Sequence, residues 1–142
     1  MHNHEPEGYA CPFCRIVAQA RDSMEGTEVV FHDETVTAFL GLLRWEKNPV
    51  DVLVVPNRHI ENPYDLPLEL APALQRVTRG AAIGLKALTR REGVSTRQRH
   101  EPAGGSGRPA LPCPRLASRG TGSTKIGKFP FPKRNESLSR NV

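Results

Sequence analysis

The feature that most constrains what this chain can fold into is a change of composition at Gly104–Gly105. Residues 1–104 carry 12 Lys+Arg and 14 Asp+Glu, a net charge of −2. Residues 105–142 carry 8 Lys+Arg and a single acid, Glu136, a net charge of +7. The overall charge of +5 therefore comes from this basic tail. Because the tail shows no aromatic–basic interleaving and no recognition module, we do not expect a nucleic-acid partner.

The basic tail also lacks the features of a folding segment. Pro109, Pro112 and Pro114 interrupt it early, and no apolar periodicity follows. Proline removes a backbone donor and is excluded from helix interiors and central strands, so no regular element is expected here. We predict an incomplete folded domain over 1–104 and a disordered tail over 105–142.

Length and cysteine usage limit the class of protein. A chain of 142 residues corresponds to one domain. No apolar run approaches bilayer length, and the first residues are polar rather than signal-like, so we expect a cytoplasmic protein without a membrane partner. The odd count of three cysteines, two of them in Cys11-Pro-Phe-Cys14, favours metal or redox chemistry over a disulfide framework.

The first 104 residues contain several recognisable elements. Glu28–His32 and Thr35–Leu40 are rich in β-branched and aromatic residues, and a turn at Asp33-Glu34 separates them. Val50–Val55 predicts a third strand that stops at Pro56. The pattern indicates a hairpin followed by a buried strand.

One long helix follows these strands. Asp65 is a candidate N-cap, with Pro67 and Glu69 in the first turn, and Gly93 ends the helix. A fourth strand can start within Gly93–Gln98, so we expect an α+β fold with an antiparallel sheet. The apolar stripe of the helix consists of Leu70, Leu74, Val77, Ala81, Leu85 and Leu88.

Cys11 and Cys14 are close enough in sequence for both thiolates to reach one metal ion. Zinc prefers four nitrogen or sulfur ligands, and His59 is a candidate for the third. Two buried, inert cysteines are an alternative of similar weight. A redox role is less favoured, because no strand is predicted before Cys11.

Together these residues resemble the histidine-triad (HIT) family of nucleotide-binding proteins. The resemblance covers about the first three-quarters of the chain, and the Leu-Val-Val-Pro-x-x-His-Ile-Glu-Asn segment is its most specific part. The matching segments are Cys-Pro-Phe-Cys-Arg-Ile (11–16), Phe-His-Asp-Glu-Thr-Val-Thr-Ala-Phe-Leu (31–40), Val-Leu-Val-Val-Pro-Asn-Arg-His-Ile-Glu-Asn (52–62) and Glu-Pro-Ala-Gly-Gly (101–105).

The resemblance implies a HIT-like antiparallel sheet with one long helix, assembled into a homodimer that binds a purine nucleotide. Such proteins hydrolyse or transfer nucleoside monophosphates from phosphoramidates or dinucleoside polyphosphates. A His-x-His-x-His run on the last strand carries this chemistry, and its middle histidine forms a nucleotidyl-histidine intermediate. By position, Gly105 would lie near the phosphate, and Cys11, Cys14 and His59 would bind zinc. The base pocket would comprise Phe13, Ile16, Phe39, Leu42 and Leu53, which by pattern alone are also ordinary core residues.

The chain departs from the family at several functional positions. Gly41 stands where a ribose-binding Asp is expected, Asp51 where a supporting His is expected, and His100 where an Asn is expected. No histidine follows His100, so the nucleophile and the fourth zinc ligand are both missing. We therefore expect a missing last strand, no catalytic residue and no turnover.

A shift of reading frame would account for these losses. Codons permitted for Ser106–Ser118, read one base later, can encode Ala-Asp-Val-Arg-His-Tyr-His-Val-His-Val-Leu-Pro-Arg. Its three histidines arise from Ala110-Leu111, Pro112-Cys113 and Pro114-Arg115. The hypothesis is an out-of-frame tail. The alternatives are a non-catalytic nucleotide- or anion-binding module with a native basic tail, or a product without function.

Overall fold

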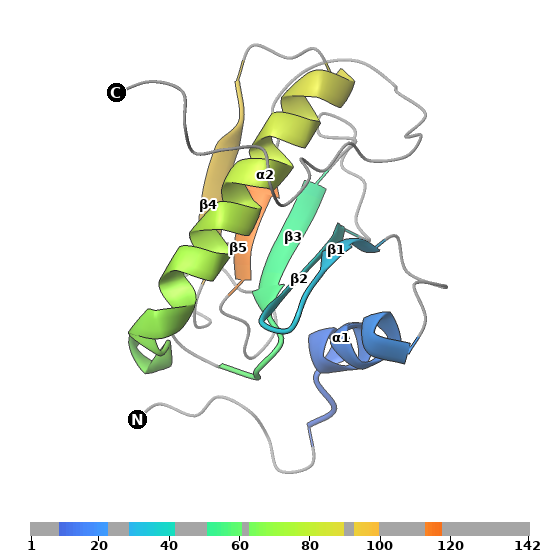
Figure 1. Cartoon of the computed structure of the whole chain (residues 1–142), viewed down its shortest axis with the longest axis vertical. Helices are drawn as coiled ribbons and strands as arrows, with labels where there is room; N and C mark the ends of the chain where they lie inside the picture. Colours follow the sequence, from blue (N-terminus) through green and yellow to red (C-terminus); the bar gives the residue numbers. More distant parts are fainter. Residues whose placement is uncertain are drawn as a thin grey trace.

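The computed structural model describes residues 9–22, 29–41, 51–60, 63–89 and 93–99, together with the backbone of 113–117. Within these residues an antiparallel sheet of five strands has the order β1-β2-β3-β5-β4. Figure 1 shows the long helix α2 (Ala71–Thr89) lying across one face of the sheet and the shorter helix α1 (Pro12–Asp22) beside β1 and β2. The expected α+β class, with an antiparallel sheet and one long helix, is confirmed.

The first three strands form where their apolar residues predict them. They are β1 (Val29–His32), β2 (Val36–Leu40) and β3 (Asp51–Pro56). All five residues of β2 are buried, because strands lie on both sides of it and helices cover both faces. The register runs from Val36↔Pro56 to Leu40↔Val52 without a shift.

The tail contributes a strand that the sequence did not predict. β5 (Cys113–Ala117) lies between β3 and β4 (Ser95–Arg99), in contrast to the expectation that the last strand is missing. Without β5, the edge of β3 would present unpaired N–H and C=O groups beside the buried core, and pairing with β5 satisfies them. The remainder of 105–142 lies outside the described residues.

The backbone pairing around Pro114 explains why a proline is compatible with this strand. Pairing with β3 runs from Asp51↔Ala117 to Leu53↔Arg115, so it ends before Pro114. Pairing with β4 continues through Gln98↔Pro114. Pro114 therefore has a neighbouring strand on one side only, and its missing N–H costs at most one ladder bond.

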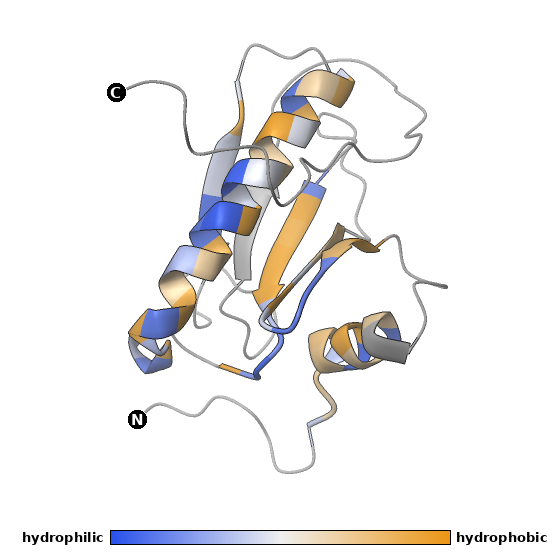
Figure 2. Cartoon of the chain, viewed as in Figure 1, coloured by the Kyte–Doolittle hydropathy of each residue, from blue (hydrophilic) through white to orange (hydrophobic). Residues whose placement is uncertain are grey.

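The two faces of the sheet support two separate apolar clusters, because successive side chains of a strand point to opposite faces. On one face, Val36, Ala38, Val52 and Val54 pack against α2. On the other face, the cluster contains α1 residues. Figure 2 shows β3 apolar along most of its length, whereas α2 alternates apolar and polar residues, as expected for a half-buried helix. The second cluster consists of Ile16, Phe39, Leu53 and Val55, with the partly buried Phe13, Val17 and Val29.

The long helix begins later than its N-cap signal predicts. The segment expected to be its first turn instead forms two short 3-10 turns, Pro63–Asp65 and Leu68–Leu70, and α2 starts at Ala71. Pro67 has an extended ψ of 127° and no side chain caps the turn that follows it. Because a residue before proline disfavours the helical region, Leu66 cannot carry a helix from Asp65 into Pro67.

No described helix is both long and apolar enough to cross a membrane.

Candidate metal and nucleotide site

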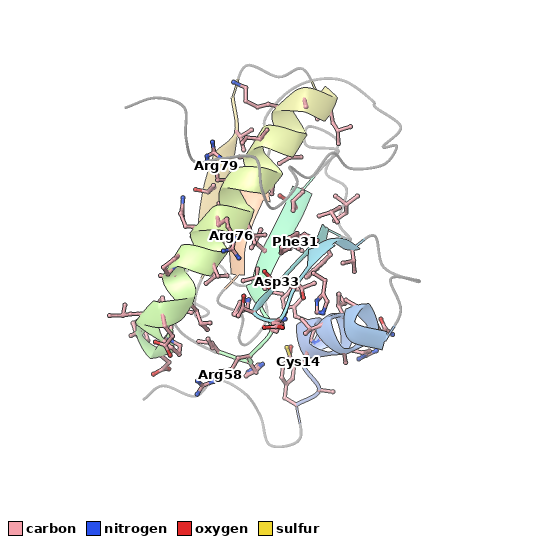
Figure 3. All side chains as sticks on the ribbon, viewed as in Figure 1. Cys14, Phe31, Asp33, Arg58, Arg76 and Arg79 are labelled. Atoms are coloured by element: carbon pink, nitrogen blue, oxygen red, sulfur yellow. The ribbon has the colours of Figure 1, made fainter. Side chains whose placement is uncertain are left out.

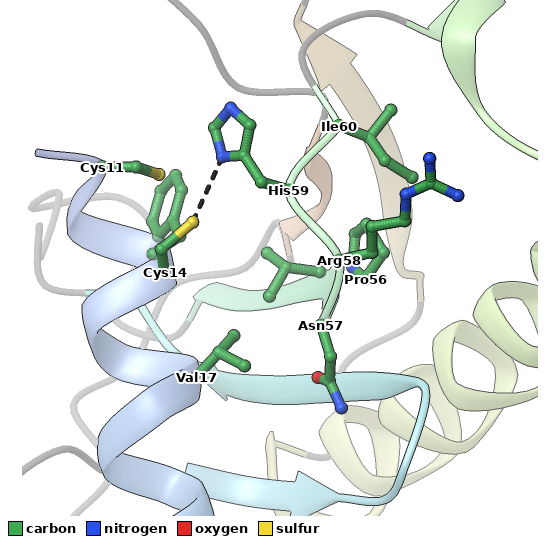
Figure 4. Close-up of a pocket in the computed structure, with 10 residues that line it drawn as sticks. Cys11, Cys14, Val17, Pro56, Asn57, Arg58, His59 and Ile60 are labelled. Atoms are coloured by element: carbon green, nitrogen blue, oxygen red, sulfur yellow. Dashed lines mark hydrogen bonds between the residues drawn. The ribbon is translucent and has the colours of Figure 1, made fainter. Parts of the chain in front are cut away.

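Three potential metal ligands converge although one of them lies far away in the sequence. The ligand atoms of Cys11, Cys14 and His59 all lie within 4.8 Å of one another. Cys14 Sγ and His59 Nδ1 are 3.2 Å apart, across 45 residues of chain. Figure 4 shows the imidazole of His59 directed towards the two sulfur atoms at the start of α1.

Local structure places these side chains. Cys11 directly precedes α1 and Cys14 lies in its first turn, where the Arg15 N–H is 3.3 Å from the Cys11 carbonyl that accepts its hydrogen bond. This helix was not predicted, although Phe13, Ile16 and Val17 begin a helical apolar spacing. β3 places His59. The chain leaves the sheet after Pro56, and the residues that follow, including His59, line the same pocket as Cys11 and Cys14.

The chemistry of this group suits zinc. Structural zinc sites combine thiolates at about 2.3 Å and imidazole nitrogens at about 2.0 Å in a tetrahedron, which requires ligand atoms roughly 3–4 Å apart. The separation of 3.2 Å between Cys14 and His59 meets this requirement. Cys14 and His59 are exposed and Cys11 is half-buried, so an ion can enter from solvent.

The structure brings together four of the five apolar residues that were expected to form a base pocket. Phe13, Ile16, Phe39 and Leu53 belong to one cluster beneath α1, and the rings of Phe13 and Phe39 are tilted with centroids 5.6 Å apart. Phe39 is fully buried and Phe13 is half-buried, so Phe13 is the aromatic surface that a ligand can reach. Leu42 and Gly105 lie outside the described residues.

A polar network at the same end of the sheet was not foreseen from the sequence. The Thr37 hydroxyl donates to Asn57 Oδ1 at 2.6 Å, and Asn57 Nδ2 donates to the Asp33 carbonyl at 2.7 Å. His32 Nδ1 lies 2.8 Å from the same hydroxyl oxygen. Because the Thr37 proton is already donated to Asn57, His32 must be the donor. The network orients Asn57, two residues before His59.

Asp33 organises the turn that supports this network. Its Oδ1 accepts hydrogen bonds from the N–H groups of Thr35 and Val36 at 2.8 Å and from the Thr35 hydroxyl at 2.9 Å. Burial alone would raise the pKa of Asp33, but these hydrogen bonds and the Arg76 guanidinium hold that pKa below its ordinary value. Figure 3 shows Arg76 on α2 close to Asp33. The turn is therefore held by an ionised carboxylate.

The fold has counterparts among solved structures. A member of the HIT family from Bacillus subtilis superposes with a TM-score of 0.65 at 25% identity, over 78% of this chain and 74% of that chain. The chain has the histidine-triad fold. The resemblance noted from the HIT segments is thus confirmed at the level of the family's structure, although no family model and no curated protein matches the sequence.

Two further HIT-fold structures are informative. A hypothetical histidine triad nucleotide-binding protein from Sulfolobus tokodaii has a TM-score of 0.65 at 19% identity, over 87% of this chain and 82% of that chain. A zinc-bound histidine triad family protein from Mycobacterium smegmatis has a TM-score of 0.61 at 19% identity, over 89% of this chain and 86% of that chain. At these identities the likeness shows a shared fold and nothing more.

Proposed function

We propose that this HIT-fold chain binds a purine nucleotide but does not transfer or hydrolyse it through a histidine intermediate. The observation that carries the proposal is the likeness to HIT proteins over at least three-quarters of the chain. The apolar cluster under α1 supports it, since Phe13 offers an accessible ring beside the buried Phe39. Aromatic and aliphatic side chains of this kind suit a planar base.

The absence of turnover follows from the sequence of the last strand. Nucleotidyl transfer of the HIT type needs an imidazole that attacks phosphorus and leaves again. β5 reads Cys-Pro-Arg-Leu-Ala and contains no histidine. Removing a covalent nucleophile leaves only the contribution of binding, so turnover should fall to the level of an unrelated protein.

We also propose zinc at Cys11, Cys14 and His59. Bound zinc would crosslink the start of α1 to the segment after β3 and stabilise the fold rather than take part in chemistry. The pair of reduced thiols that it requires suits the expected cytoplasmic location. A homodimer remains a prediction of the resemblance, to be tested by sedimentation.

Turnover and binding can be separated with one pair of assays. Calorimetric titration of the zinc-loaded chain with adenosine monophosphate should show saturable binding, and adenosine phosphoramidate should not be hydrolysed. Phe13→Ala should weaken the binding, whereas Leu68→Ala, on a side chain that is 85% exposed and outside the cluster, should not. Hydrolysis by the wild-type chain would refute the inactive assignment, and absence of nucleotide binding would refute the proposal itself.

The out-of-frame origin of the tail stays part of this proposal. β5 contains Pro114-Arg115, one of the three pairs whose codons can encode histidine one base later, and it begins at Cys113, the second residue of another. Resequencing the gene should reveal a single-base insertion or deletion near the codon for Ser106. A gene that restores no His-x-His-x-His in any frame would eliminate this origin.

A replacement of residues 106–118 by the frame-shifted sequence tests the same idea in the protein. We expect this variant to hydrolyse adenosine phosphoramidate. The same replacement with alanine in place of its middle histidine is the matched control and should be inactive. Equal activity of the two would show that hydrolysis does not depend on the histidine.

A further inference from the structure

The histidine of the candidate metal group lies in a segment without regular structure. Cys11 and Cys14 are at the start of α1, whereas His59 follows Pro56, the last residue of β3, and belongs to no helix or strand. Arg58 and His59 are both exposed. An exposed side chain loses conformational freedom when it becomes a metal ligand, so a segment that is already fixed binds the metal more tightly.

Both ends of this exposed pair are anchored. Asn57 precedes the pair and is half-buried, and Ile60 follows it with an exposed fraction of only 7%. Burial holds Ile60, because returning an apolar side chain to water is unfavourable. Hydrogen bonds hold Asn57 instead.

Three hydrogen bonds tie Asn57 to the turn between β1 and β2. Its backbone N–H donates to the Thr35 carbonyl at 2.8 Å. In its side chain, Nδ2 donates to the Asp33 carbonyl at 2.7 Å, and Oδ1 accepts from the Thr37 hydroxyl at 2.6 Å. A short amide offers a donor and an acceptor together, which an ionised aspartate does not, so this pair of side-chain bonds depends on asparagine.

The partners of Asn57 are themselves fixed. Thr37 is fully buried in β2, and the Asp33 carboxylate accepts three hydrogen bonds within the turn. Figure 4 shows the Asn57 amide directed away from the sulfur atoms and from the His59 imidazole. Asn57 is therefore an anchor attached to the sheet and not itself a metal ligand.

We propose that Asn57 is a positioning residue, which fixes the segment after β3 so that the His59 imidazole faces the thiols of Cys11 and Cys14. The inference rests on the proposed zinc site and adds a residue that determines its affinity without touching the ion. The anchor accounts for the separation of 3.2 Å between Cys14 Sγ and His59 Nδ1, although the two residues are 45 positions apart.

Zinc affinity tests the proposal. In competition with a chromophoric chelator, Asn57→Ala should weaken zinc binding to the full chain by about tenfold or more, as is typical for residues behind the ligands. Glu34→Gln is the matched control, because it alters an exposed side chain of the same turn and should leave the affinity unchanged. Wild-type affinity in Asn57→Ala would overturn the positioning role and leave the zinc site intact. A wild-type chain that binds no zinc would overturn the site together with its positioning residue.

A double variant separates positioning from a general effect on the fold. His59→Ala should leave a weaker site at Cys11 and Cys14, and adding Asn57→Ala should weaken that site no further, because Asn57 acts through His59. Additive losses would show that Asn57 supports the fold as a whole and would overturn the proposal.

A second single variant keeps the test decisive if Asn57→Ala does not fold. Thr37→Val removes one of the three hydrogen bonds of Asn57 with little change of shape. It should lower the zinc affinity in the same direction as Asn57→Ala and by a smaller factor, since two hydrogen bonds remain. Unchanged zinc affinity in Thr37→Val would overturn the proposal.

Discussion

The backbone N–H of Gly41 donates a hydrogen bond of 2.7 Å to the Asp51 carbonyl, and the two residues meet side by side where β2 ends and β3 begins. A Cβ at position 41 would lie 3.1 Å from the Asp51 Cβ and 3.6 Å from its Oδ2. The two departures from the HIT pattern are therefore neighbours in space. The carboxylate expected at position 41 would stand beside the carboxylate that is present at 51.

This adjacency predicts coupled effects of substitution. Gly41→Asp should lower the free energy of unfolding by about 1–3 kcal/mol, through crowding and like-charge repulsion. Adding Asp51→His should recover part of the loss, because the imidazole removes the second negative charge. Urea unfolding of both single variants and the double variant measures the coupling. Gly41→Ala isolates the crowding, and if it destabilises as much as Gly41→Asp, charge plays no part.

Asp33 should make the stability depend on pH in the acid range. Its folded-state pKa lies below the ordinary value of 3.8, so its stabilising effect is complete above 3.8 and is lost as the pH falls through the folded-state pKa. Asp33→Asn should flatten the decline of stability between about pH 5 and pH 2. Denaturant unfolding across that range tests this, with the exposed Glu34→Gln as a control that should retain the wild-type slope. An unchanged slope in Asp33→Asn would contradict the assignment.

Arg76 should contribute little to the same effect. Its guanidinium is 3.3 Å from Asp33 Oδ2, but its side chain is 60% exposed. Exposed ion pairs are worth about 0–1 kcal/mol. Arg76→Ala should therefore change the free energy of unfolding by less than about 1 kcal/mol, as measured by urea unfolding. A larger loss would mean that the ion pair, rather than the backbone donors, holds the turn.

The free energy of unfolding should depend on the hydroxyl of Thr37 more than on the volume of its side chain. It is fully buried, and its hydroxyl joins His32 to Asn57. Thr37→Val leaves both partners without this contact and should cost about 1–3 kcal/mol of unfolding free energy. Thr37→Ser keeps the hydroxyl and should cost less. A reversed order of the two variants in urea unfolding would show that packing dominates at this position.

Removal of zinc should destabilise the protein by mass action. At free zinc 100-fold above the dissociation constant, binding to the folded state adds about 2.7 kcal/mol to the free energy of unfolding. A chelator should therefore lower the melting temperature of the wild-type chain. It should have little effect on Cys14→Ser, which lacks a ligand. A wild-type melting temperature insensitive to both zinc and chelator would argue against a structural metal.

Local sequence patterns correctly predicted the strands that are built from continuous apolar runs. β2 and β3 appear within a residue of their predicted bounds, because β-branched side chains buried on both faces favour a strand strongly. The start of α2 was displaced, since the restriction that Pro67 places on Leu66 outweighs the capping preference of Asp65. α1 was missed because a single short apolar spacing is a weak signal by itself.

The sequence alone determined the family resemblance, the cysteine pair and the absence of a histidine in the last segment, because these depend only on which residues are present and in what order. Tertiary structure decided which residues and strands that are distant in sequence become neighbours in space. It brought His59 to Cys14, set Gly41 against Asp51 and inserted β5 beside β3. The physical reason is that unpaired strand edges and unburied apolar faces are satisfied by whichever segment the fold brings near, and neither proline content nor net charge of a segment specifies that neighbour.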